Sequence, residues 1–146
     1  MKIYLDSCSL QRPLDNRNQI RIALEAEAVL GILALCEAGQ LDLISSDALE
    51  FEAAQISHSI RREHALAILG IAAARVELGD QIEQRARHFI ESGIKPMDAL
   101  HLGSAEAADC DYFCTCDNRF LRRAKEITDL QTTVVSPLEL VEELEI

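Results

Sequence analysis

Short, largely apolar runs alternate along this chain with longer segments of helical spacing, and this alternation limits the possible folds more than any other feature. Runs of strand length occupy residues 2–5, 41–44, 111–115 and 132–135. Strands that alternate with helices are typical of a parallel α/β sheet. Strands this apolar are expected where helices cover both faces of the sheet. We therefore predict an α/β fold, with a small parallel sheet flanked by helices on both faces.

Apolar residues at helical spacing predict the helices between these strands. The predicted helices are residues 20–38, 47–58, 62–74, 80–92, 97–108 and 138–144, with a further helix from residue 118. Residues 76–78 are predicted to be a short extended piece. Residues 7–18 contain Pro13 and two asparagines, and we predict a loop there.

Length and composition predict one folded domain over residues 1–146. The chain has 146 residues and is 49% hydrophobic, which suffices for a core. No run of about 18 apolar residues is present. Asp6 also interrupts the N-terminus before an apolar leader can form. We therefore expect a cytoplasmic protein with no membrane contact.

The five cysteines are expected to be reduced in that compartment. Cys114 and Cys116 lack a second pair with zinc-site spacing, so buried structural thiols are favoured over a zinc site. Cys8 is a candidate catalytic thiol only if a histidine lies beside it. His101, one turn after Asp98, is the candidate partner, and a packing or capping role for His101 is favoured over that pairing.

The formal net charge of −11 argues against nucleic-acid binding, because phosphate backbones attract Lys and Arg. Three explanations remain open at this point. A cluster of carboxylates that binds a cation is acidic by necessity. A basic partner could cover an acidic surface. The protein could also never meet nucleic acid.

Four carboxylates stand where a parallel sheet places its ligands, outside the carboxyl ends of the strands. Asp6 directly follows the first predicted strand, and Asp117 lies two residues beyond residues 111–115. Glu52 and Asp98 lie early in predicted helices, and each interrupts an apolar surface. A carboxylate in such surroundings is unfavourable unless it is paired or bound to metal.

Converging carboxylates repel one another, and a divalent cation removes that repulsion. Mg²⁺ or Mn²⁺ prefers such oxygen ligands and can activate a water molecule. Simpler roles remain open for each acid. Asp6 could be a turn residue, Asp98 a helix-dipole partner and Asp117 an N-cap. Glu50, close to Glu52, could be the residue that faces the site instead.

The sequence resembles the PIN-domain family, and more narrowly the VapC-type toxin ribonucleases. The segments that carry the resemblance are residues 3–7 (Ile-Tyr-Leu-Asp-Ser), 46–52 (Ser-Asp-Ala-Leu-Glu-Phe-Glu), 94–102 (Ile-Lys-Pro-Met-Asp-Ala-Leu-His-Leu), 113–120 (Phe-Cys-Thr-Cys-Asp-Asn-Arg-Phe) and 135–139 (Val-Ser-Pro-Leu-Glu). They span nearly the whole chain in the family's order. A serine six residues before the second acid prefers Glu52 over Glu50 in this comparison.

The resemblance implies a metal-dependent endoribonuclease that cleaves single-stranded RNA, often a homodimer, with a protein antitoxin as partner. It implies that Asp6, Asp98 and Asp117 hold Mg²⁺ or Mn²⁺. Glu52 would help to bind or activate the attacking water. Ser7 would orient a ligand or phosphate.

Two features depart from the family pattern. Asn118 stands where many members have another acid, which favours one metal over two. The strong acidity is unhelpful for RNA, although basic residues follow two of the acids. They are Arg12 and Arg17 after Asp6, and Arg119, Arg122, Arg123 and Lys125 after Asp117. Both groups could flank one cleft and steer phosphates, or the second could be a solvated helix face.

Two other functional classes are alternatives. A PIN-like module that binds RNA or protein without cleaving would fit the charge and the missing acid. A phosphoaspartate protein is suggested by Asp6 after the first strand. A haloacid-dehalogenase-like phosphatase needs a second Asp where Cys8 stands. A receiver domain needs an acidic pair and a late Lys, and that pairing is not evident. The ribonuclease is favoured over both of these alternative functions.

Overall fold

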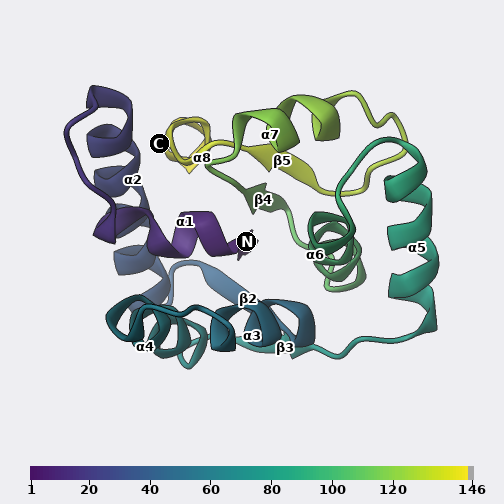
Figure 1. Cartoon of the computed structure of the whole chain (residues 1–146), viewed down its shortest axis with the longest axis horizontal. Coiled ribbons are helices and arrows are strands. Elements are labelled where there is room, and N and C mark those ends of the chain that lie inside the picture. The colour runs from purple at the N-terminus through teal and green to yellow at the C-terminus, as the bar shows by residue number, and fades with distance from the viewer. Residues whose placement is uncertain (145–146) are drawn as a thin grey trace.

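Five parallel strands form one sheet at the centre of the computed structural model, which describes residues 1–144 (Figure 1). The predicted domain ran to residue 146, and residues 145–146 lie outside the described part. The strands are β1 (Lys2–Leu5), β2 (Asp42–Ser46), β3 (Ala74–Val76), β4 (Tyr112–Cys114) and β5 (Thr133–Val135). Their spatial order is β3-β2-β1-β4-β5, so the chain first builds outward from β1 and then crosses over it.

Eight α-helices and one 3₁₀ turn connect the strands in the described residues. They are α1 (Ser7–Gln11), η1 (Arg12–Leu14), α2 (Ile20–Glu37), α3 (Asp47–Ala54), α4 (Ser59–Leu69), α5 (Asp80–Glu91), α6 (Pro96–Ala107), α7 (Asn118–Lys125) and α8 (Pro137–Leu144). None of these helices is long and apolar enough to cross a membrane.

The central strand β1 is buried on both faces. Ile3, Tyr4 and Leu5 are each 0% exposed, and successive strand residues point to opposite faces. Helices therefore cover both sides of the sheet, which confirms the predicted α/β fold. The Tyr4 ring stacks on Phe113 of β4 with centroids 5.1 Å apart. Phe113 in turn meets the edge of Phe120 on α7. Aromatic contacts thus tie the two central strands to the helix that follows β4.

The segment after β1 is not the loop that was predicted for residues 7–18. Ser7–Gln11 forms the short helix α1, and Arg12–Leu14 continues it as a 3₁₀ turn. Asp6 starts this helix, because its side chain accepts a hydrogen bond from the backbone N–H of Ser9. A single turn of helix carries too few residues for a hydrophobic period, so the sequence pattern could not reveal it.

The region after β2 also differs from the prediction. The helix predicted over residues 47–58 ends at Ala54, and the next one begins at Ser59 rather than at residue 62. The helix predicted over residues 62–74 ends at Leu69. Residues Ala74–Val76 form β3 and pair with β2, whereas the short extended piece was predicted at residues 76–78. Alanine favours helices in isolation, and pairing with a neighbouring strand outweighs that weak preference.

Candidate active site

All four predicted acids line one pocket at the carboxyl ends of β1 and β4. The pocket has a volume of about 250 Å³ and is lined by Asp6, Ser7, Cys8, Gln11, Glu52, Asp98 and Asp117. The strands β1 and β4 are parallel neighbours, with Leu5 paired with Cys114. The residues that follow these two strands are therefore adjacent, as the rule for open parallel sheets predicts.

Asp6 is held firmly in place directly after β1. Its side chain is buried, and Oδ1 accepts hydrogen bonds from the Ser9 backbone N–H at 3.0 Å and the Cys8 thiol at 3.1 Å. Burial raises the pKa of Asp6 above its ordinary value, while hydrogen bonds from Thr115 and Cys8 act in the opposite direction. The fold therefore fixes a buried carboxylate at the base of the pocket.

Asp98 lies in the first turn of α6, which Pro96 begins. Burial raises the pKa of Asp98 to about 6, and the nearby charge of Asp6 is the next cause. Asp117 and Glu52 also raise it, while His101 lowers it. The charges of the other three acids therefore all contribute to the raised pKa of Asp98.

Asp117 has two structural relationships at once. It is the N-cap of α7, and its Oδ1 accepts hydrogen bonds from the backbone N–H groups of Arg119 at 2.9 Å and Phe120 at 3.2 Å. The same side chain lines the acidic pocket. The predicted N-cap and the predicted site residue are thus the same group.

Glu52 rather than Glu50 faces the pocket. Glu52 lies in the second turn of α3, and its Oε1 is 3.0 Å from His101 Nε2. Glu50 points toward the edge of the sheet, where its Oε2 accepts hydrogen bonds from Ser45 Oγ and Arg75 Nε, both at 2.9 Å. The alternative that the sequence left open is therefore decided by placement, while the chemical role of Glu52 stays a prediction.

His101 is buried on α6 beside the acidic pocket, where its hydrogen-bond partners were not predicted. It contacts Glu52 and the hydroxyl of Tyr4, whereas the Cys8 thiol donates to Asp6. His101 is therefore a packed residue, as favoured, and Cys8 bonds Asp6 rather than His101. Its position three residues after Asp98 places His101 on the same helix face. That spacing was the available signal.

The chemistry of the pocket suits a hard divalent cation, because its acids offer carboxylate oxygens. Within residues 1–144, however, no three His, Cys, Asp or Glu side chains are grouped closely enough to hold a metal ion. Like charges repel, so carboxylates that converge on one pocket raise one another's pKa. The raised pKa values of Asp6 and Asp98 reflect burial first and, for Asp98, this repulsion second.

A second pocket adjoins the first and is basic on one side. It has a volume of about 180 Å³, and Asp98 and Asp117 line both pockets. Lys95, Arg119 and Arg123 provide its positive charges. A phosphate seated there would lie beside the acids.

Three other predicted basic residues, Arg122, Arg12 and Arg17, do not line this basic pocket. Arg122 is exposed on α7 and is not among the lining residues. Arg12 pairs with Asp15, and Arg17 with Glu27 on α2, so the first predicted basic group is engaged by acids. Ser7 lines the acidic pocket, and its Oγ accepts a hydrogen bond from Gln11.

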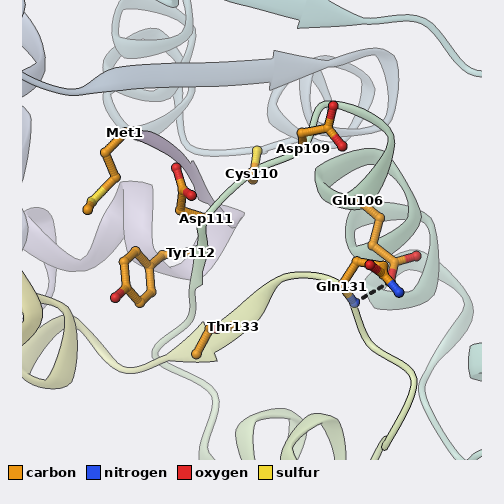
Figure 2. A pocket seen from close by; sticks show the side chains of 8 residues that line it. All are labelled: Met1, Glu106, Asp109, Cys110, Asp111, Tyr112, Gln131 and Thr133. Atoms are coloured by element: carbon orange, nitrogen blue, oxygen red, sulfur yellow. Dashed lines mark hydrogen bonds between the residues drawn. The ribbon is translucent and has the colours of Figure 1, made fainter.

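A larger pocket of about 390 Å³ lies at the opposite ends of the strands (Figure 2). Asp111, Tyr112 and Thr133 line it near the amino ends of β4 and β5. Glu106 reaches it from α6 and accepts a hydrogen bond from the Gln131 backbone N–H at 2.8 Å. Ligands of parallel sheets bind at the carboxyl ends, so this larger hollow is the less favoured site.

Comparisons with known proteins agree with this arrangement. The PIN domain family matches residues 3–126, so the chain belongs to that family. Its members are generally nucleases that use divalent metal ions. Comparison with curated proteins gives no match. The fold is similar to nine chains of solved structures.

Two of these structures cover nearly the whole chain. VapBC2 from Rickettsia felis, bound to a DNA fragment from its promoter, has a TM-score of 0.57 at 12% identity, over 93% of this chain and 98% of that one. PAE2754 from Pyrobaculum aerophilum has a TM-score of 0.56 at 14% identity, over 99% of this chain and 89% of that one. At these identities the likeness concerns the fold.

Proposed function

We propose that this PIN-domain protein is a metal-dependent endoribonuclease that cleaves single-stranded RNA, and that it is the toxin of a toxin–antitoxin pair. The observation that carries the proposal is the meeting of four acids from distant segments in one pocket beside a basic pocket. Membership of a family of nucleases supports it.

In this proposal Asp6, Asp98 and Asp117 hold one Mg²⁺ or Mn²⁺. A cation in that position stabilises negative charge that develops on phosphate and makes a water more acidic. Glu52, at the rim of the pocket, accepts the proton of the attacking water. Asn118 offers no carboxylate for a second cation, so we assign one metal.

Basic side chains beside the acids would bind the RNA backbone. Lys95, Arg119 and Arg123 contact the phosphates next to the scissile bond, because they line the pocket that shares Asp98. Arg122, exposed on the same helix as Arg119, contacts phosphates farther along the strand. Ser7 orients the phosphate at the acidic end.

Exposed apolar side chains support the antitoxin and the homodimer as partners. Phe51, Ile60 and Ile20 are 60%, 66% and 80% exposed on three different helices. A bound antitoxin or a second copy of the chain would cover such side chains and remove apolar surface from water. A basic antitoxin would also neutralise part of the charge of −11. The solved VapBC2 complex has a similar fold and gives this pairing a precedent.

The test is cleavage of transfer RNA, ribosomal RNA and an unstructured synthetic RNA with Mg²⁺ or Mn²⁺, with and without EDTA. Asp98→Asn removes one site carboxylate, and we expect it to abolish metal-dependent cleavage. Glu142→Gln serves as the charge-matched control. It removes one exposed carboxylate of α8, next to Glu143, which bonds Tyr112 at the amino end of β4 and so away from the acids. Cleavage that persists in Asp98→Asn, or in EDTA, would contradict the proposed site.

A non-cleaving PIN-like module is the second candidate function. The net charge of −11 favours it, as does Asn118, which stands where many members of the family have another acid. RNA or protein binding without cleavage of any of the three RNAs would select this alternative.

A further inference from the structure

A chain of hydrogen bonds runs from the buried core to Glu52 at the rim of the pocket. Ser46 Oγ lies 2.6 Å from the Tyr4 hydroxyl, which lies 2.7 Å from His101 Nδ1. His101 Nε2 lies 3.0 Å from Glu52 Oε1. Ser46 and Tyr4 are fully buried and His101 is 1% exposed, whereas the Glu52 side chain is 34% exposed. Of the four residues in this hydrogen-bond chain, Glu52 is therefore the one that reaches solvent.

The Glu52 carboxylate at one end and the Ser46 hydroxyl at the other determine which groups donate and which accept along this hydrogen-bond chain. An ionised carboxylate only accepts hydrogen bonds, so ionised Glu52 requires the proton on His101 Nε2. A neutral imidazole then has no proton on Nδ1, which must accept from the Tyr4 hydroxyl. A phenol keeps its proton near neutral pH, so the Tyr4 hydroxyl can donate to Nδ1. Tyr4 is then free to accept from the hydroxyl of Ser46.

The inner end of the chain is anchored to the helix that carries Glu52. Ser46 is the N-cap of α3, and its Oγ accepts from the Leu49 backbone N–H at 3.0 Å. That bond leaves the Ser46 hydroxyl proton available for Tyr4. One residue thus sets both the start of α3 and the far end of the chain that holds the Glu52 side chain. The two constraints fix Glu52 from its backbone and from its carboxylate.

Packing alone does not account for these residues. The Tyr4 ring already stacks on Phe113, and a phenylalanine would make that contact without a buried hydroxyl. Buried polar groups destabilise a core unless each finds a partner. Here three buried groups satisfy one another in a line that ends at an acid of the pocket.

We propose that His101 is a positioning residue, held by Tyr4 and Ser46 as the Nε2–H tautomer so that it aims the Glu52 carboxylate into the site. The inference rests on the proposed function, in which Glu52 accepts the proton of the attacking water. His101 itself touches neither the substrate nor the scissile bond. Its effect on cleavage passes through the orientation of Glu52.

Two substitutions of His101 separate the ring nitrogens. In His101→Gln the side-chain amide reaches the position of Nε2 and can still donate to Glu52. In His101→Asn the shorter amide reaches only the position of Nδ1. We expect His101→Gln to retain kcat within about threefold, and His101→Asn to lose roughly 10- to 100-fold in kcat with an unchanged KM. Equal activity of His101→Asn and the wild type overturns the proposal.

Tyr4→Phe tests the chain without changing the histidine. It removes one oxygen and should lower kcat, because Nδ1 loses the donor that holds the tautomer. Tyr112→Phe is the matched control, since the Tyr112 hydroxyl donates to the exposed Glu143, away from the pocket. Loss of activity in both variants, or in neither, contradicts the proposal.

Nitrogen-15 NMR of the ¹⁵N-labelled full-length protein reads the tautomer without any nuclease assay. We expect a proton on Nε2 and none on Nδ1 of His101 at pH 7.5, and a mixture of tautomers in Tyr4→Phe. A proton on Nδ1 in the wild type overturns the proposal. If no RNA is cleaved, the proposed function fails while the NMR result still decides the state of the hydrogen-bond chain.

Discussion

Asp98 shows how its surroundings tune a single residue. Its carboxylate is partly withdrawn from water in the first turn of α6, and Asp6, Asp117 and Glu52 all lie near enough to raise its pKa. The resulting pKa of about 6 differs from the ordinary value of 3.8. Folding therefore favours the protonated form of this residue, which has consequences for stability and for cation binding.

The first prediction concerns stability against pH in the metal-free protein. Because the folded pKa lies above the unfolded value, the folded state binds more protons between about pH 4 and 6. The contribution of Asp98 to unfolding free energy therefore falls as pH rises through this window. We expect Asp98→Asn to be more stable than the wild type at pH 7.5, with a smaller difference below pH 4. Urea unfolding at the two pH values measures this, and a difference independent of pH contradicts it.

The second prediction concerns the cation. A divalent ion that binds only the folded protein stabilises it by an amount that rises with the logarithm of its concentration relative to Kd. We expect millimolar Mg²⁺ or Mn²⁺ to raise the Tm of the wild type at pH 7.5. The rise should shrink at pH 5, where Asp98 holds its proton, and in Asp98→Asn. Thermal unfolding with and without EDTA measures it, with Glu142→Gln behaving as the wild type. An equal rise in Asp98→Asn argues that the ion binds elsewhere.

At the level of single elements, two of the acids also start helices. Asp6 caps α1 and Asp117 caps α7, so each carboxylate is fixed by backbone N–H groups as well as by its place after a strand. A helix N-terminus favours negative charge, which partly offsets the repulsion among the acids. Asp6 and Asp117 therefore each combine a capping role with a proposed metal-binding role. Separating the two roles requires substitutions that keep one and remove the other.

The third prediction separates those roles at Asp117. Asparagine can accept the same two backbone hydrogen bonds, whereas alanine cannot. We expect Asp117→Ala to lose about 1 kcal/mol of unfolding free energy and Asp117→Asn to lose little. Both should lose metal-dependent cleavage. Denaturant unfolding and the RNA assay measure the two effects. Cleavage retained in Asp117→Asn would restrict Asp117 to its capping role.

At the level of the whole molecule, the distribution of charge matters more than its sum. The chain carries a net charge of −11, and its acids would repel RNA. Lys95, Arg119 and Arg123 nevertheless gather in one pocket beside Asp98. A local basic patch can guide a phosphate into an acidic protein, because at an ionic strength of about 0.1 M, salt largely screens charges more than about 10 Å away.

The fourth prediction tests that patch. We expect Arg119→Ala and Arg123→Ala to raise the KM for RNA several-fold, and their double variant to weaken the dependence of KM on salt. Arg87→Ala removes an exposed arginine of α5 that lies outside both pockets, and its KM should match the wild type. Cleavage kinetics at two salt concentrations measure this. A similar KM change in all three single variants would indicate a general charge effect rather than a phosphate pocket.

Much of the fold was predictable because it depends on patterns that are local in the chain. The buried strands, the long helix α2 and the proline that starts α6 all leave a clear signal in consecutive residues. The positions of Asp6 and Asp117 followed from the same patterns, since each follows a strand. The helix α1 and the pairing of β3 were missed. The first is too short for a period, and the second depends on contact with β2.

The sequence alone determined the α/β class, the family resemblance and the four acids at the ends of their elements. Only the tertiary structure decided that Glu52 rather than Glu50 faces the pocket, and that His101 holds it. Both acids lie on the same short helix, and their directions depend on partners more than twenty residues away, Arg75 for one and His101 for the other. Hydrogen bonds between distant segments exist only once the sheet and helices are assembled, so no local pattern records them.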